Sequence, residues 1–451
     1  MILKIICLVL LIWKKIKGDF MAKDTNLSLR NQMIYQIFPR QYSETSNFQG
    51  ILQDLNRIQQ LGVDILYLLP IHPIGKKNRK GSVGCPYSIQ DYWSIDPSLG
   101  TLEDFKQLID GVHQHGMKLM IDVVFNHTSR DSEILKKRPE WMYCNEHGEF
   151  SGKVGDWWDV TDLDFSQKEL WQELLKILCY WANLGVDGFR CDVASMVPLE
   201  FWKLAREELL KINPNFILLA ESIEVSFVKH IRDLGFEASS DCELYEAFDM
   251  EYDYDIWEYY EHYIQTGEGL NTWLKEILRQ EGRYPENYVK IRCLENHDRH
   301  RVSEFIKDGI RLRNLHATMF FLKGAAFVYA GSEAVDEKLE SLFERDLVDW
   351  SNLGKFDLPA LLKRCSEIKK APIFKNGIFD IHLSELEVIH ITYRTKEEMV
   401  ECLFNAGNIQ GFVPAQLMDG QYSNLFDGST IQIQDGRLQI GENPIILKTN
   451  N

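Results

Sequence analysis

The sequence predicts an α/β protein: a (β/α)₈ TIM barrel with a short insert after the third strand and a small C-terminal all-β domain. Three observations support this fold class. Short β-branched runs alternate with longer helical patterns from about residue 31. Several of these runs are apolar almost throughout, as expected for parallel strands buried on both faces. Beyond about Pro372, short alternating strands and turns replace the helical patterns.

Strand candidates occur at regular intervals through the first three quarters of the chain, and the sixth is the weakest of them. They cover residues 33 to 39, 65 to 70, 118 to 125, 186 to 193, 216 to 221, 247 to 250, 289 to 295 and 325 to 331. Eight parallel strands, each followed by a helix, are what a closed barrel requires.

Helical patterns lie between these strands, with apolar residues at spacings of three and four. Gly62, Gly116 and Gly185 stand where three of the helices should end, because glycine adopts the left-handed conformation that ends many helices. The expected helices are residues 51 to 61, 102 to 115, 167 to 183, 199 to 212 and 301 to 322.

The order of these elements predicts the domain boundaries. The barrel is expected over residues 31 to 127 and 166 to 372, and a C-terminal β-sandwich over residues 373 to 451. Residues 128 to 165 form a polar, aromatic insert after the third strand. A connection of this length is usually functional, and at the carboxyl end of a barrel strand it should overhang the active-site face.

Residues 1 to 30 are interpreted as an N-terminal extension. The apolar run from Ile5 to Trp13 is shorter than the roughly 20 residues that span a bilayer, and its flanks do not resemble a secretory signal. Met21 begins a stretch typical of the natural start of a protein. Residues 1 to 20 are therefore expected to be an upstream extension of the reading frame. A short membrane tether is the alternative.

Composition excludes several classes of partner. The net charge of −17 leaves no basic face for a nucleic acid. Nine scattered cysteines without a CxxC pair are typical of a reduced, cytoplasmic protein rather than a disulfide framework or zinc site. Aromatic residues make up 12% of the chain, which suits stacking on sugar rings. No membrane partner is expected, and composition leaves the oligomeric state open.

Polar residues gather at the ends of four predicted strands. Because charge is costly to bury without a purpose, their convergence at the carboxyl face of a barrel indicates an active site. The four segments contain Asp122, Asn126 and His127; Arg190 and Asp192; Glu221; and Asn296, His297 and Asp298.

Three of these acidic residues suit hydrolysis of a glycosidic bond with retention of configuration. That reaction needs an ionised nucleophile and a protonated acid roughly 5 to 5.5 Å apart. Arg190 shares a strand face with Asp192 and should keep this nucleophile ionised. Glu221 should feel two negative neighbours that raise its pKa and so act as general acid/base, while Asp298 binds sugar hydroxyls and distorts the ring.

The same segments, DVVFNHT, GFRCDVAS, LLAES and ENHDRH, resemble in order the four sequence regions of the α-amylase superfamily, glycoside hydrolase family 13. Three flanking stretches, IYQIFPRQYS, PYSIQDYWSIDPSLGTLEDF and FVYAGSEAVDEKLESLFERDLVDW, also resemble this family. The likeness covers about residues 31 to 352. It implies a catalytic trio of Asp192, Glu221 and Asp298. It further implies sugar contacts from Tyr87, His127, Arg190 and His297, with Asp122 bracing the arginine.

Departures from the family pattern bear on the substrate and the metal. Ser195 and Met196 replace the Lys-His pair of many relatives, and VTDLDF replaces the QPDLN-like signature of enzymes for α-1,6 bonds. An enzyme for α-1,4 bonds in maltooligosaccharides or starch-type glucans is the leading expectation.

The chemistry requires no cofactor. Calcium is a candidate ligand because Asn126 occupies a calcium-ligand position of many relatives, with Asp156, Asp159, Asp162 or Asp164 as further donors.

Two alternatives stay open beside hydrolysis. A transglycosylase would use the same carboxylates and pass the glucosyl group to another sugar. A non-catalytic, membrane-tethered relative is the second alternative, against which the three intact acidic residues stand. A barrel enzyme that uses a cofactor lacks support, because the sequence contains no GxGxxG after the first strand and no phosphate-binding loop.

Overall fold

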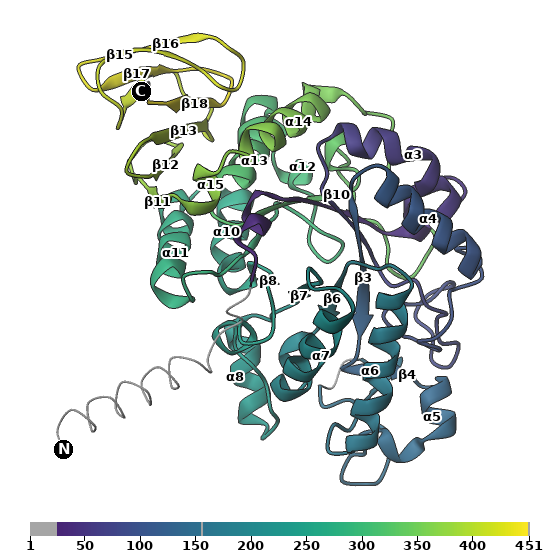
Figure 1. The fold of residues 1–451 in the computed structure, drawn as a ribbon. Helices are drawn as coiled ribbons and strands as arrows, with labels where there is room; N and C mark the ends of the chain where they lie inside the picture. Colours follow the sequence, from purple (N-terminus) through teal and green to yellow (C-terminus); the bar gives the residue numbers. More distant parts are fainter. Residues whose placement is uncertain (1–24, 155–156, 450–451) are drawn as a thin grey trace, which may run out of the picture.

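The computed structural model describes residues 25 to 154 and 157 to 449. A parallel sheet in the order β8-β7-β6-β3-β2-β1-β10-β9 surrounds the centre of the main domain (Figure 1). A parallel bridge between Glu251 and Lys290 joins the two outermost strands, which confirms the predicted barrel. The strands are β1 (Met33–Ile37), β2 (Ile65–Leu68), β3 (Lys118–Val124), β6 (Gly188–Asp192), β7 (Ile217–Ala220), β8 (Met250–Glu251), β9 (Ile291–Arg292) and β10 (Ala325–Tyr329).

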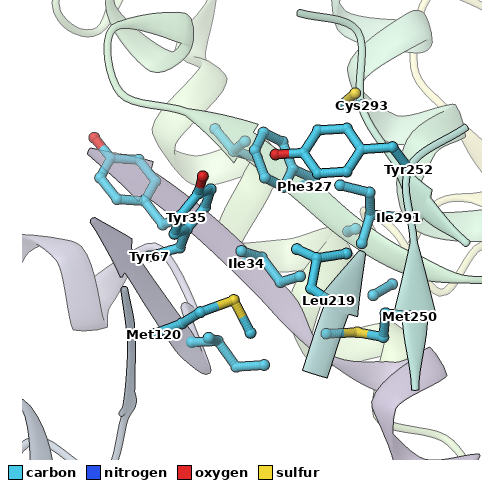
Figure 2. Close-up of a cluster of buried hydrophobic side chains, with 14 of the residues drawn as sticks. Ile34, Tyr35, Tyr67, Met120, Leu219, Met250, Tyr252, Ile291, Cys293 and Phe327 are labelled. Carbon is cyan, nitrogen blue, oxygen red and sulfur yellow. The ribbon is translucent and has the colours of Figure 1, made fainter. Parts of the chain in front are cut away.

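Apolar side chains fill the barrel interior, as Figure 2 shows. They come from strands on all sides of the barrel and are almost completely buried: Ile34, Tyr67, Met120, Leu219, Met250, Ile291 and Phe327. A barrel packed in this way is a core rather than a pore, so a ligand can reach it only at its ends.

Helices cover the outside of the barrel. They include α3 (Phe48–Gln60), α4 (Leu102–Gln114), α6 (Lys168–Asn183), α7 (Leu199–Ile212), α8 (Val225–Asp233), α10 (Trp257–Thr266), α11 (Leu270–Arg283) and α14 (Leu358–Lys369). Gly62, Gly116 and Gly185 have φ of +88°, +73° and +108°, directly after α3, α4 and α6. The predicted glycine stops are therefore confirmed.

The single helix predicted over residues 301 to 322 is wrong. The structure has two helices there, α12 (Val302–Phe305) and α13 (Gly309–Phe321). The side chain of Asp308 accepts hydrogen bonds from the backbone N–H groups of Ile310 and Arg311, both at 2.9 Å, and so begins a new helix. Apolar periodicity runs through the break and could not reveal it.

The insert after β3 contains a small antiparallel sheet of β4 (His127–Ser129) and β5 (Val160–Asp162), with a short helix, α5 (Glu133–Lys137), between them. His127 is paired with Asp162 in this sheet. The two ends of the insert are therefore paired at His127, a predicted site residue. This pairing holds the insert at the carboxyl end of the barrel.

The C-terminal region folds as two four-stranded sheets with a shared apolar core. The first contains β11 (Ile378–Ile381), β12 (Val388–Arg394), β13 (Met399–Asn405) and β18 (Ile445–Lys448), and the second contains β14 (Gly411–Pro414), β15 (Gly420–Ser423), β16 (Thr430–Gln434) and β17 (Arg437–Ile440). The short strands and turns expected beyond Pro372 are present, and one of the turns follows β16. Asp435 and Gly436 have φ of +52° and +66° and form the tight turn of a hairpin between β16 and β17. The sequence did not indicate β14.

Within residues 25 to 154 and 157 to 449, no helix has both the length and the apolar character needed to cross a bilayer. The apolar run from Ile5 to Trp13, with the interpretation of residues 1 to 20 as an upstream extension, lies outside the described residues.

Candidate active site

A cavity of about 260 Å³ opens where the barrel strands end. Five of the predicted catalytic and sugar-binding residues line it: Tyr87, His127, Asp192, Glu221 and Asp298. Asp122, Arg190 and His297 lie directly beneath them and are buried. The structure therefore brings all eight predicted catalytic and sugar-binding residues together.

Arg190, at the centre of β6, organises the floor of the cavity. Its Nη1 donates to Asp122 Oδ1 and to Asp192 Oδ1, both at 2.8 Å, and its Nη2 lies 2.7 Å from Glu221 Oε1. The guanidinium is completely buried. One fixed cation therefore holds carboxyl groups from three neighbouring strands close together, as a reaction that uses two carboxyl groups requires.

Asp122 is held by two tyrosines as well as by the arginine. Its Oδ2 accepts from Tyr67 Oη at 2.7 Å and from Tyr87 Oη at 3.1 Å. With Oδ1 bonded to Arg190, every side of this buried carboxylate is occupied. Asp122 is thus a positioning residue that fixes the guanidinium, and Tyr87 links it to the cavity wall.

The pKa values of Asp192 and Glu221 depart from the sequence-based expectation. Burial, followed by the neighbouring Glu221, raises the pKa of Asp192 well above its ordinary value despite Arg190. Burial also raises the pKa of Glu221, with Asp298 adding to the effect and Arg190 opposing it. We expected only Glu221 to be raised. Since both are, titration alone does not assign the acid and the nucleophile, and the raised values belong to the pair.

Hydrogen bonds distinguish the two carboxyl groups better. Asp192 uses Oδ1 for Arg190 and leaves Oδ2 4.0 Å from His127 Nε2 on the cavity side. Glu221 accepts the backbone N–H of Val193 on Oε2 at 2.7 Å. Asp192 therefore has one oxygen free to approach a sugar carbon. Glu221 is instead held by the backbone of Val193, the residue that follows β6.

Asp298 stands at the mouth of the cavity with 36% of its side chain exposed. Its Oδ2 lies 3.0 Å from His297 Nε2. Partial burial raises the pKa of Asp298, but His297 outweighs it, and the net pKa falls below the ordinary value. Gln36 Nε2 contacts His297 Nδ1 at 2.9 Å and Tyr87 Oη contacts its Nε2 at 2.5 Å, so the imidazole is fixed on both sides.

His127 forms the wall nearest to Asp192. Burial lowers the pKa of His127 to about 4, so the ring is neutral at physiological pH. Its ring lies 5.4 Å from the ring of Trp157, centroid to centroid. A neutral imidazole beside the nucleophile can donate a hydrogen bond to a sugar hydroxyl without adding a charge.

Sequence reasoning missed part of the cavity wall. Lys80, from the loop after β2, forms an ion pair of 2.8 Å with Asp159 of the insert. Leu342 and Phe343, from the loop after β10, also line the cavity. Asp159 had been considered only as a calcium donor. No periodic pattern marks contacts between loops, and only the length of the insert pointed to this region.

The donors proposed for calcium do not form a ready site. The buried Oδ1 atoms of Asn126 and Asp162 have no hydrogen-bond partner, which suits a cation ligand. Asp159 is instead paired with Lys80, and Asp164 accepts from Ser166 and Gln167. Asp156 lies outside the described residues. In the part of the chain that is described, no three His, Cys, Asp or Glu side chains gather closely enough to hold a metal.

The chain matches two family models along most of its length. The α-amylase catalytic domain matches residues 36 to 159 and 137 to 356. The bacterial α-amylase C-terminal domain matches residues 380 to 447. The two models correspond to the barrel with its insert and to the C-terminal sheets.

Individual relatives agree with this assignment. The crystal structure of an α-amylase from Lactobacillus plantarum is 40% identical with a TM-score of 0.91, and the match covers 94% of this chain and 100% of that one. An intracellular maltogenic amylase from Bacillus subtilis is 25% identical over 80% of this chain and 62% of its own length. An α-1,4-glucan:maltose-1-phosphate maltosyltransferase from Picrophilus torridus is 29% identical over 56% of this chain.

The chain spans only 40% of the maltosyltransferase and 62% of the maltogenic amylase, but it spans the whole of the Lactobacillus structure. The matched segments include all four motifs and the strand ends that surround the cavity. This chain therefore belongs to the α-amylase family of glycosidases, with the catalytic barrel and the C-terminal domain of that family.

Proposed function

We propose that this protein is a retaining glycoside hydrolase that cleaves α-1,4-glucosidic bonds in maltooligosaccharides or related glucans. The observation that carries the proposal is the Arg190 guanidinium, which holds Asp192 and Glu221 side by side at the floor of one cavity. Both carboxyl groups are accessible from that cavity, and Asp298 stands at its mouth.

In the first step, Asp192 Oδ2 attacks the anomeric carbon of the sugar above it. A glycosyl ester forms as the glycosidic bond breaks, and the proton of Glu221 passes to the departing oxygen. Arg190 holds the other Asp192 oxygen, so the attacking carboxylate approaches in a fixed orientation. Asp298 remains ionised and binds sugar hydroxyls, with contacts that strengthen as the ring flattens toward the transition state.

In the second step, the ionised Glu221 takes a proton from water. The water oxygen bonds to the anomeric carbon, and Asp192 leaves as a carboxylate, which restores both protonation states. Two inversions at one carbon give net retention. The raised pKa of the pair favours the one-proton state from which this cycle begins.

The initial anomer of the product tests the proposal. Proton NMR during the first turnovers on maltotriose should show the α-anomer before mutarotation, and pullulan, isomaltose, sucrose and trehalose should reveal which linkage is cut. An initial β-anomer would refute the retaining mechanism. Preferential cleavage of isomaltose would refute the assigned linkage.

Transfer to a second sugar is the alternative outcome, favoured by the similarity to a maltosyltransferase. Its chemistry differs only in which hydroxyl attacks the glycosyl ester. Incubation with maltotriose discriminates, because oligomers longer than the substrate accumulate only if a sugar competes with water for the ester.

We further propose a cytoplasmic location. The eight cysteines in the described residues are all free thiols, as expected in a reducing compartment. The matching relative from Bacillus subtilis is named as intracellular. Fractionation of the native host should place the protein in the cytoplasmic fraction, and recovery with membranes would support the tether alternative.

A further inference from the structure

The ion pair between Lys80 and Asp159 joins two loops at the wall of the catalytic cavity. The side chain of Asp159 is 3% exposed and that of Lys80 is 17% exposed, and both line the cavity. An ion pair removed from water in this way is seldom a strong source of stability, because the loss of hydration offsets most of the attraction. Its place beside the substrate cavity suggests a role in binding.

Neighbouring contacts fix the ion pair. The Lys80 ammonium lies 4.6 Å from the ring centre of Trp158 and 5.8 Å from that of Phe343. The backbone N–H groups of Val83 and Gly84 both donate to the Phe343 carbonyl, at 3.1 and 3.2 Å. The loop after β2, the insert and the loop after β10 therefore form one continuous wall.

Gly81 shows how tightly this wall is built. Its φ is +63°, and a Cβ atom there would lie 2.7 Å from both the carbonyl oxygen and the Cβ of Phe343. A larger residue would therefore force the two loops apart. The wall is a defined structure rather than an incidental contact of two long side chains.

The ion pair lies toward the nucleophile. Trp157, two residues before Asp159, packs on His127, whose Nε2 is 4.0 Å from Asp192. The acid Glu221 must face the departing half of the substrate. The half that the nucleophile retains, which ends at the non-reducing terminus of the glucan, therefore extends toward the ion pair.

We propose that the ion pair of Lys80 and Asp159 makes this enzyme exo-acting, so that it removes short units from the non-reducing ends of α-glucans. The inference rests on the proposed function and deepens it. A terminal glucose has a free 4-hydroxyl, which can accept from an ammonium and donate to a carboxylate. An internal glucose carries another sugar on that oxygen, so the rest of the glucan chain would have to pass through the wall.

The size of the cavity agrees with a short retained segment. Its volume of about 260 Å³ lies just below the roughly 300 to 1,000 Å³ usual for ligand pockets. Leu342 and Phe343 also line it. A long chain that continues in both directions would need an open groove instead.

Two matched substrates test the inference: a p-nitrophenyl maltooligoside with a free non-reducing end, and the same compound with its terminal 4- and 6-hydroxyls capped as a cyclic acetal. The wild-type enzyme should shorten the free substrate stepwise, and cleave the capped one about 10- to 100-fold more slowly, as loss of bonds to charged groups implies. Equal rates on both would overturn the inference. Failure to cleave either would refute the proposed function instead.

Variants connect the effect to the ion pair. Lys80→Ala and Asp159→Asn should reduce the ratio of the rates on the free and the capped substrate to near unity. Lys80→Arg should keep this ratio. Lys77→Ala is the control, because Lys77 is exposed on the same loop and does not line the cavity. Preference unchanged in Lys80→Ala would contradict the role of the pair.

A measurement on the unmodified enzyme covers the case in which the variants fail to fold. Acting on amylose, an exo-enzyme releases short sugars from the first turnovers, while the viscosity of the solution falls slowly. A rapid fall in viscosity with products of all lengths would overturn the inference.

Discussion

Two clusters in this molecule each surround one buried cation with three carboxylates, yet only one of them lies at the catalytic cavity. The first consists of Arg190 with Asp122, Asp192 and Glu221, and the second of Lys290 with Asp241, Glu251 and Asp255. Both cations are completely buried. Burial and charge alone therefore do not distinguish an active site from a structural cluster.

The two clusters differ in what their oxygens face. In the Lys290 cluster, Tyr284 Oη donates to Asp255 at 2.6 Å and lies 3.2 Å from Asp241 Oδ2, and the lysine also donates to the Tyr252 carbonyl at 2.9 Å. This cluster lies where the Glu251 and Lys290 backbones close the barrel. Asp192, in contrast, keeps one oxygen toward the cavity. A carboxylate that protein donors leave partly free, beside a cavity, is the more specific mark of catalysis.

The largest effect should come from the two carboxyl groups that face the cavity. Asp192→Asn should lower kcat by at least about 10⁴-fold, as loss of a nucleophile does in other hydrolases. Glu221→Gln should lower it by about 10² to 10⁴-fold, as loss of a general acid does. Steady-state kinetics on maltotriose measures both, with circular dichroism to show that the fold persists. A rate close to wild type for either variant would refute its role.

The opposite pattern is expected for the second cluster. Lys290→Met should lower the free energy of unfolding by about 3 to 5 kcal/mol, because it leaves buried carboxylates without their cation. Activity per folded molecule should stay near that of wild type. Urea denaturation and active-site titration measure the two quantities. Loss of turnover in a folded Lys290→Met protein would remove the distinction between the clusters.

Asp298, at the edge of the cavity, provides a further test of the comparison between the two clusters. Asp298→Asn should lower kcat by about 10² to 10³-fold with a small change in KM, because its contacts strengthen in the transition state. Glu304→Gln is a suitable control, since this exposed carboxylate contacts His300 nearby and does not line the cavity. A rise in KM with unchanged kcat would show that Asp298 only binds the ground state.

The smallest expected effect concerns pH. The pKa values of Asp192 and Glu221 are raised in the folded protein, so their stabilising contribution is present below the ordinary carboxyl pKa of about 4 and is lost as pH rises through the raised values. Asp192→Asn should therefore unfold at a slightly higher temperature than wild type at pH 7, and the difference should shrink at pH 4. A lower unfolding temperature at pH 7 would mean that the ionised nucleophile stabilises the fold.

The same titration governs activity. Turnover should fall on the acid side as the Asp192 and Glu221 pair takes up a second proton, at a pH above the ordinary carboxyl value, and on the alkaline side as the pair loses its single proton. The pH profile of kcat/KM on maltotriose measures both limbs. An acid limb at the ordinary value would show that Arg190 outweighs burial.

The sequence predicted much of this account. All eight barrel strands were expected, because short apolar runs alternate with amphipathic helical patterns, although the weakest prediction, residues 247 to 250, shares only Met250 with β8. The eight catalytic and sugar-binding residues follow strand ends within recognisable motifs, so their convergence could be inferred. The Lys80 and Asp159 pair, the Phe343 contact and the Lys290 cluster could not, because contacts between distant segments leave no local pattern. The break at Asp308 was hidden for a related reason: a capping residue interrupts the backbone without changing the apolar spacing.

The covalent intermediate offers the most direct test of the central claim, that Asp192 attacks the sugar. A 5-fluoroglycosyl fluoride should glycosylate the enzyme with loss of fluoride and slow the second step, so that mass spectrometry of a digest can locate the sugar. We expect one glycosyl group on the peptide that contains Asp192, and none in Asp192→Asn. A glycosyl group on Glu221 or Asp298 would contradict the mechanism.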